Sequence, residues 1–326
     1  MTARPDQHTA GVLADVRVAV TGADEATVCA LRGAGARLVA PTAAEVWISP
    51  GPPLRPEPVV ITATAAALRT PLVVSATDLD RANRALSALT CDTAAGTWPA
   101  DVRLAAPVTP RLAVTPDVPE PVRATLAEAG MQVTVLDGDP VRGGTDSLDA
   151  LVISSRPPPV ASGCLVTVRH GPGTAPLTVA AGPFQDAVVL DIAAALAGEP
   201  VIEQVWPLRG AEPVELVVFG AHLRGGALTH QLTDLGARWA GELTTAPRYR
   251  MSVLATVPAK PAVTRVAAGA PGAALYGQRW VMSAAALGRF LAALPAPMQL
   301  GKVDARAGPY RRPRPARRPP ANSRSR

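Results

Sequence analysis

Apolar residues recur in two strand–helix–strand units in the first half of the chain. Residues 16–22 (VRVAVTG) have the continuous apolar pattern of a buried strand, 25–35 place apolar residues on one helical face before a glycine, and 36–41 form a second strand. The same order of strand, helix, Ala-Gly and strand recurs over 111–136. Because such a crossover joins parallel strands, the repetition predicts an α/β layer with parallel strands.

Further apolar segments extend this layer. We expect an amphipathic helix over 78–90, a short buried strand over 148–154 and a strand over 177–183. The apolar segment 186–198 predicts a helix that ends at a glycine followed by Glu-Pro. All of these elements precede residue 200, so they belong to one predicted domain.

The pattern changes across 200–213, which we expect to join two domains. Beyond it, strands are predicted from 214–220 onward, with a helix over 283–295 and a last strand over 298–305, an arrangement typical of a compact α+β domain. Eight of the eleven aromatic residues lie from Trp206 onward. The predicted division is a disordered lead (1–14), an α/β domain (15–205), an α+β domain (206–305) and a disordered tail (306–326).

Composition and charge narrow the function classes. The chain has 326 residues, 48% of them apolar, which is enough for packed cores and excludes wholesale disorder. The net charge is +6, but eight arginines lie within 306–326, and subtracting them leaves −2 for the rest. A general nucleic-acid-binding surface is therefore not expected. The Arg/Pro tail is interpreted as a solvated segment without function, with association of the tail with nucleic acid or a membrane as the alternative.

Cysteine spacing and hydropathy indicate in which cellular compartment the protein is expected. Cys29, Cys91 and Cys164 stand far apart with no CxxC pair, so neither a disulfide framework nor a zinc site is predicted. No run of about 18 apolar residues occurs, so no membrane partner is expected. We expect a cytoplasmic protein and predict no cofactor and no metal.

The densest group of chemically useful residues lies within 217–232. A strand ends at Gly220, and His222 follows before a pair of glycines. Such a turn exposes backbone N–H groups that bind anions, and a histidine there could transfer a proton to an anchored substrate. The alternative is a plain hairpin in which His222 hydrogen-bonds a turn carbonyl.

A second group lies within 244–251. Arg248 and Arg250 share one face of a predicted strand, with Tyr249 on the other. Two guanidinium groups would suit a small carboxylate or dianion. Two solvent-facing arginines on an edge strand are the alternative.

Several motifs in order over 214–308 carry a family resemblance. FGAHLRGGALTHQL, GARWAGELTTAPRYRM, AKPAVTRV and FLAALPAPMQLGKVDARAG resemble the C-terminal domain of allophanate hydrolase. The resemblance implies a small α+β, β-barrel-like domain similar to the gamma-glutamylcyclotransferase-like fold. More weakly, segments between 71 and 198 resemble the late part of the preceding amidase-signature domain.

The resemblance also implies a site and a reaction. In this family the C-terminal domain is understood to decarboxylate N-carboxycarbamate, which the amidase domain forms from allophanate. The implied substrate-binding residues are Gly220, Ala221, Leu223, Tyr249 and Arg250, with Arg250 on a substrate carboxylate. The implied catalytic residue is His222, which would protonate the nitrogen released when CO2 departs.

The chain departs from the family pattern at several positions. An amidase-signature enzyme needs a lysine and two serines, but the two lysines here, Lys260 and Lys302, both lie in the second domain. Thr229 replaces the family's Asn, and the residues after 308 leave the pattern. We therefore expect residues 15–205 to be a truncated amidase-like domain without amide hydrolysis.

Two other functions compete with the enzyme. A non-catalytic scaffold for a separate amidase or urea carboxylase is the main alternative, and a homodimer is a candidate assembly.

The segment 18–40 superficially resembles the nucleotide-binding start of short-chain dehydrogenases, but only Gly22 precedes Gly33, and no tyrosine has a lysine four residues later. A nicotinamide site is therefore not expected.

Overall fold

The computed structural model describes most of the chain. The described ranges are 11–51, 58–68, 70–90, 98–136, 148–154, 163–171, 173–200, 202, 204–255, 259–296 and 298–305. The predictions for residues 1–10, for Cys91 and for the tail at 306–326 lie outside these ranges.

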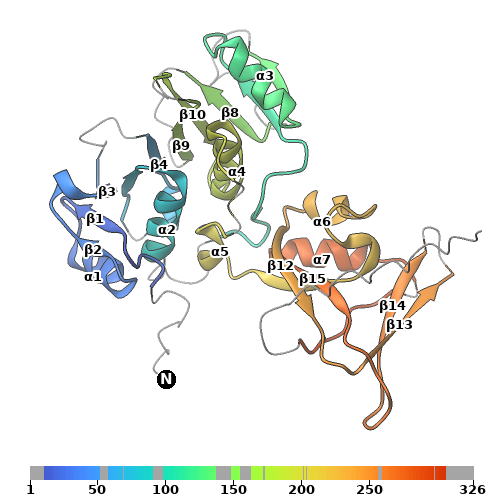
Figure 1. The fold of residues 1–326 in the computed structure, drawn as a ribbon. Helices are drawn as coiled ribbons and strands as arrows, with labels where there is room; N and C mark the ends of the chain where they lie inside the picture. Colours follow the sequence, from blue (N-terminus) through green and yellow to red (C-terminus); the bar gives the residue numbers. More distant parts are fainter. Residues whose placement is uncertain are drawn as a thin grey trace, which may run out of the picture.

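The N-terminal part of the protein is built on one ten-stranded sheet with helices packed against it (Figure 1). Its strands are β1 (Arg17–Val20), β2 (Arg37–Leu38), β3 (Val46–Ser49), β4 (Val59–Thr62), β5 (Val73–Ala76), β6 (Arg111–Val114), β7 (Gln132–Val135), β8 (Ala150–Ile153), β9 (Cys164–Arg169) and β10 (Pro176–Ala181). Its helices are α1 (Glu25–Gly33), α2 (Leu79–Leu89), α3 (Glu120–Glu128), α4 (Asp186–Ala197) and the short α5 (Pro207–Gly210).

The strand order β2-β1-β3-β5-β4-β9-β10-β8-β6-β7 makes this a mixed sheet. Both predicted strand–helix–strand units are confirmed, because β1 pairs with β2 and β6 pairs with β7 in parallel. Parallel pairing is confined to the outer strands, where β1 also pairs with β3 and β6 with β8. The central strands β5, β4, β9 and β10 pair antiparallel. For the β9–β10 pair, the short connection between the two strands requires this direction.

Local sequence explains where the helices begin and end. The Asp24 carboxylate accepts the Thr27 N–H at 2.8 Å, and Asp78 accepts the Arg81 N–H at 2.8 Å, so each caps the first turn of its helix. At the other end of α4, Gly198 adopts a left-handed φ of 65°. This is the glycine stop that the sequence predicts.

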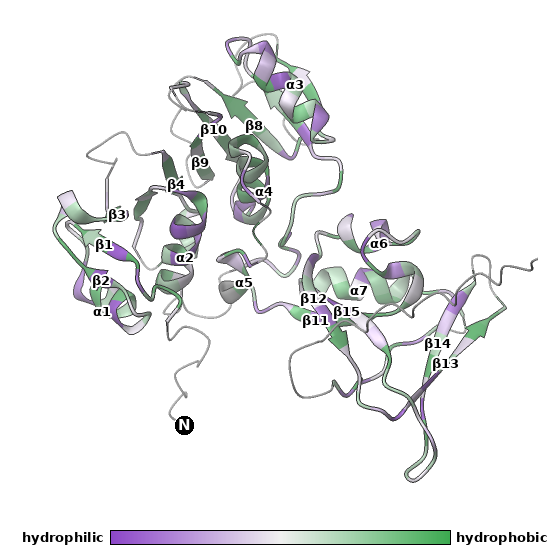
Figure 2. Cartoon of the chain, viewed as in Figure 1, coloured by the Kyte–Doolittle hydropathy of each residue, from purple (hydrophilic) through white to green (hydrophobic). Residues whose placement is uncertain are grey.

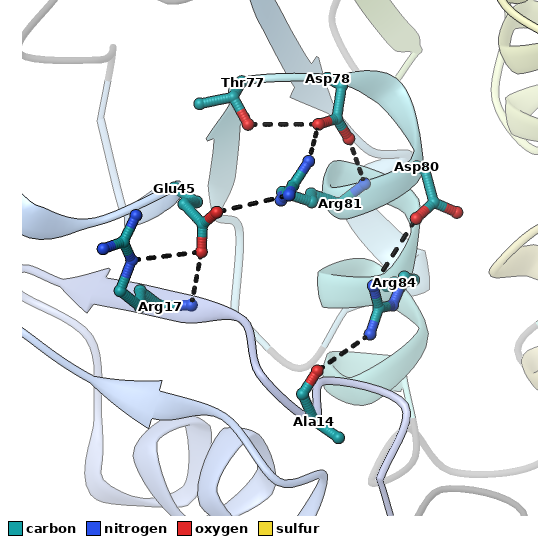
Figure 3. Close-up of polar contacts among 8 residues, drawn as sticks. All are labelled: Ala14, Arg17, Glu45, Thr77, Asp78, Asp80, Arg81 and Arg84. Carbon is teal, nitrogen blue, oxygen red and sulfur yellow. Dashed lines mark hydrogen bonds and ion pairs between the residues drawn. The ribbon is translucent and has the colours of Figure 1, made fainter.

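Charged residues fix α2 to the sheet (Figure 3). Glu45 accepts the backbone N–H of Arg17 at 3.2 Å and pairs with the side chains of Arg17 and Arg81 at 3.3 Å each. The Arg17 N–H, followed by these positive charges, lowers the pKa of Glu45. On the next turn of α2, Arg84 pairs with Asp80 and reaches the Ala14 carbonyl at 3.4 Å. These contacts fix the position of α2 relative to the sheet and to the N-terminal turn.

The N-terminal core runs continuously from Leu13 to Trp206, both of which are fully buried. Figure 2 shows the hydrophobic character of β8, β9 and β10 beside the more hydrophilic outer helix α3. Trp98 packs edge-on against Phe184 and Trp206, with ring centroids 5.2 and 5.8 Å apart. The packed region therefore reaches just beyond 15–205 at both ends.

The C-terminal part has a separate, smaller core. Its elements are β11 (Val214–Val218), a 3₁₀ turn η4 (Gly220–His222), α6 (His230–Thr233), β12 (Arg238–Thr244), β13 (Tyr249–Leu254), β14 (Lys260–Arg265), β15 (Tyr276–Met282) and α7 (Ala284–Ala292). Strands β11, β15 and β12 form an antiparallel sheet, and β13 pairs with β14 in a ribbon to one side (Figure 1). Trp280 and Phe290 are buried between this sheet and α7.

One predicted element of this part was wrong. The strand expected over 298–305 does not form, and only Ala305 makes an isolated bridge, to Thr245. Within the ranges that the structure describes, no helix is long and apolar enough to cross a membrane.

A buried ion pair joins the two parts. The Arg238 guanidinium from β12 contacts both carboxylate oxygens of Asp191 from α4 at 2.7 Å. It also donates to the carbonyls of Leu104 and Ile202 at 2.6 Å each. Arg238 is only 4% exposed. Because each of these contacts crosses from the small sheet to the N-terminal part, the pair fixes how the two parts meet.

Candidate functional site

The glycine-containing turn predicted after the first C-terminal strand is present. Strand β11 ends at Val218, and Gly220 opens η4 with a φ of 66°. A Cβ at Gly220 would lie 2.6 Å from Cγ of Pro261 on β14. Both the positive φ and this close approach require glycine here. The turn is therefore pressed directly against the β13–β14 ribbon.

His222 sits at the end of this turn and is buried. It is 9% exposed, and its ring packs edge-on against Phe290, with centroids 5.5 Å apart. Its Nε2 lies 3.0 Å from Oε1 of Gln231. Because that oxygen only accepts, Nε2 carries the proton and Nδ1 keeps its lone pair. The partner is thus a side chain on α6 rather than a turn carbonyl.

The electrostatics of His222 favour the neutral ring. Burial lowers its pKa, and the charges of Lys260 and His230 lower it further, while the Gln231 hydrogen bond acts in the opposite direction. At neutral pH the ring is an unprotonated base. A bound anion would offset the nearby positive charge and raise the pKa again.

A chain of side-chain hydrogen bonds holds the residue after the turn. The Arg224 N–H donates to Oε1 of Gln278 at 2.6 Å, and the Gln278 amide donates to the Tyr276 hydroxyl at 3.1 Å. Tyr276 in turn donates to Glu242 at 3.0 Å. The Arg224 guanidinium lies over the Trp239 ring, 5.0 Å from its centroid. These supports were not predicted, because their only signal in the sequence is polar residues within an otherwise apolar strand.

The residues of the second predicted group, Arg248, Tyr249 and Arg250, lie on two opposite faces, as the strand period predicts. Tyr249 is buried at 2% exposure, while Arg248 and Arg250 are exposed on the opposite face. The Tyr249 hydroxyl accepts the Asp304 N–H at 2.7 Å, and the Asp304 carboxylate pairs with Arg248 at 3.5 Å and with Arg265. Tyr249 thus positions the segment before the tail instead of facing an open site.

The β13–β14 ribbon places Lys260 near the turn, whereas Arg250, the predicted cation, lies further along the ribbon. Leu254 pairs with Lys260 beside the turn, whereas Arg250 pairs with Thr264, four pairs along the ladder. At about 3.3 Å per residue, Arg250 begins roughly 13 Å from Lys260. Because the charge of Lys260 acts on His222, the structure groups Gly220–Leu223 with Lys260, a cation that was not among the predicted site residues.

The described residues near the turn include no group of metal-ligating side chains. Within the described residues, no three His, Cys, Asp or Glu side chains come together as metal ligands would.

Comparisons with known proteins agree with the resemblance. Residues 214–311 match the family model described as the allophanate hydrolase C-terminal domain. The fold is similar to Kluyveromyces lactis allophanate hydrolase, with a TM-score of 0.64, 15% identity, 91% of this chain and 83% of that chain covered. A serine-to-alanine variant of that enzyme gives the same TM-score and identity, over 90% of this chain and 82% of that chain.

The same fold similarity reaches a larger protein. The K. lactis urea amidolyase aligns with a TM-score of 0.64 and 15% identity over 90% of this chain, which spans 30% of that chain. No curated protein matches the sequence significantly. These similarities show a mixed α/β fold of the allophanate hydrolase type and a C-terminal domain related to that of the family.

Proposed function

We propose that this allophanate hydrolase-like chain acts in urea and allophanate breakdown, and that its C-terminal domain decarboxylates N-carboxycarbamate. The observation that carries the proposal is the buried, neutral His222 beside Lys260, on a glycine turn within the segment that matches the family's C-terminal domain. The fold similarity to allophanate hydrolase is consistent with it.

The substrate is a dianion with a carboxylate on each side of one nitrogen. We propose that Lys260 attracts one carboxylate while the N–H groups that open the turn, at Ala221 and His222, bind it. Leu223 and the Gly220–Pro261 contact close the turn from the sides. Exposed Arg250 serves as an outer cation that draws the dianion toward the ribbon.

The proton balance gives His222 its role. As the C–N bond breaks, CO2 leaves with no charge and the electron pair stays on nitrogen, which must gain one proton to become carbamate. Binding of the dianion raises the pKa of His222 by offsetting Lys260, so the ring takes up a proton from water. Protonated Nδ1 then donates this proton to the nitrogen, while Nε2 stays bonded to Gln231.

The roles of the remaining parts follow from their residues. We propose that 15–205 is an amidase-like domain that does not hydrolyse amides, because both lysines of the chain lie in the C-terminal part. We also propose that the small sheet and ribbon are a variant of the gamma-glutamylcyclotransferase-like barrel. Tyr249 supports the β13–β14 ribbon through Asp304. The proposed setting is the cytoplasm.

The test supplies N-carboxycarbamate continuously from allophanate with a separate amidase and follows CO2 release by stopped flow. The wild-type chain should accelerate release above the spontaneous rate in proportion to its concentration. No acceleration at any concentration would contradict the proposed reaction.

A scaffold role is the second candidate, favoured by the buried Arg238–Asp191 pair that fixes the N-terminal part to the C-terminal domain. A rigid two-part body of this kind could present a separate amidase or urea carboxylase with a fixed surface. Stable co-elution of such an enzyme with a chain that releases no CO2 would support it over catalysis.

A further inference from the structure

A cavity lies where the two parts meet, away from the turn at His222. Its volume is about 400 Å³. Its chemically relevant lining residues are Asp101, Arg103, Phe184, Gln185, Asp234 and Arg289. Small-molecule sites typically have volumes of roughly 300–1,000 Å³ and are frequent at such boundaries.

The N-terminal wall of the cavity is held in a strained conformation. Phe184 has a φ of 62°, which a non-glycine residue rarely adopts. Its N–H donates to Oγ1 of Thr64 at 2.8 Å, and Thr64 donates through both its N–H and its hydroxyl to buried Asp186, at 2.9 and 2.6 Å. Trp98 packs edge-on against the Phe184 ring. The surroundings thus fix a backbone shape that costs energy.

The segment 99–103, which also lines the cavity, is joined to the C-terminal part by backbone hydrogen bonds of its neighbouring residues. The Leu104 N–H donates to the Gly236 carbonyl at 2.9 Å, and the Ala285 N–H donates to the Ala100 carbonyl at 3.0 Å. Asp234 and Arg289 come from the α6 and α7 region beside these contacts. The cavity is therefore framed by pieces of both parts in a fixed arrangement.

The polar groups of the cavity are only partly paired. Arg103 forms an ion pair with Asp149, with a nitrogen–oxygen distance of 2.5 Å. Within the described residues, Asp101, Asp234 and Arg289 make no ion pair, and the buried Oε1 of Gln185 has no hydrogen-bond partner. The unpaired set is one guanidinium, two carboxylates and one amide oxygen. It complements a molecule with a carboxylate at one end and a cationic nitrogen group at the other.

We propose that this cavity binds a small zwitterion of the basic amino-acid type. Its carboxylate pairs with Arg289, and its cationic end donates to Asp101, Asp234 and Gln185. The site is separate from the proposed dianion site and takes a ligand of different charge, so it does not rest on the role of His222.

Calorimetric titration of the full chain with L-arginine tests the proposal. Binding should be clearly weaker for agmatine, which lacks the carboxylate, and for L-citrulline, which lacks the distal charge. Arg289→Met and Asp234→Asn should each weaken L-arginine binding by about tenfold or more. Both side chains are exposed, so both variants should fold.

Arg32→Met, on the exposed end of α1, and His222→Gln serve as controls and should bind L-arginine like the wild type. No binding to the wild type, or equal binding to the Arg289 and Asp234 variants, would overturn the proposal. Loss of binding in His222→Gln alone would also overturn it, by placing the ligand at the turn.

Discussion

At the scale of single residues, His222 combines burial with an adaptable protonation state. Gln231 fixes the tautomer, Phe290 shields the ring, and Lys260 disfavours a second proton until an anion arrives. A histidine in this setting responds to ligand charge more than to bulk pH. The sequence located His222 because it follows a strand and a glycine, but its partners come from α6, α7 and β14.

The lowered pKa of His222 predicts a pH effect on stability. The folded state binds its proton less readily than the unfolded chain, whose histidine titrates near 6.5, so stability is full above that pH and falls as pH drops through the folded pKa. The contribution to the slope stays below about 1.4 kcal/mol per pH unit.

Urea unfolding at pH 7.5 and 5.5 should show a smaller loss of stability for His222→Gln than for the wild type. His230→Gln, at an exposed neighbour, is the matched control and should keep most of the wild-type pH dependence, because His230 has the smallest influence on the pKa of His222. An equal pH dependence in His222→Gln and the wild type would contradict the neutral buried ring.

At the scale of elements, the turn after β11 depends on the ribbon that it touches. The sequence predicted the turn from Gly220, and it predicted the alternation of Tyr249 and Arg250 from the strand period. It could not predict that Lys260 would reach the turn, because this depends on the register of β13 with β14. The predicted strand over 298–305 failed because its residues find only one bridge, at Ala305.

Replacing Gly220 tests this contact. Gly220→Ala combines a left-handed φ with a clash against Pro261 and should destabilise the protein by roughly 2–4 kcal/mol. Gly225→Ala is the control, since Gly225 also has a positive φ, of 80°, but open space around it, and should cost only about 1 kcal/mol. Equal unfolding midpoints for the two variants would mean that the Pro261 contact contributes nothing.

At the scale of the whole molecule, the two parts are joined by a pair that no local pattern indicated. Asp191 was visible only as one of two acids within an apolar helix, and Arg238 as one base at the start of a strand. The two βα units were predictable because caps and glycines encode them locally. The central antiparallel strands were not, since their pairing joins segments as distant as β4 and β9.

Breaking the interface pair should be costly. Arg238→Met leaves the Asp191 carboxylate buried without its cation and should destabilise the protein by about 3–5 kcal/mol. Arg248→Met, at an exposed pair, is the control and should cost at most about 1 kcal/mol. Thermal unfolding would contradict the account if the two variants lost the same stability.

The central claim is that His222 protonates the departing nitrogen, and CO2 release from amidase-generated N-carboxycarbamate tests it most directly. His222→Ala should lower the catalysed rate by about 10²-fold or more, toward the spontaneous rate, while His230→Ala keeps the wild-type rate. Equal rates for His222→Ala and the wild type would contradict the claim.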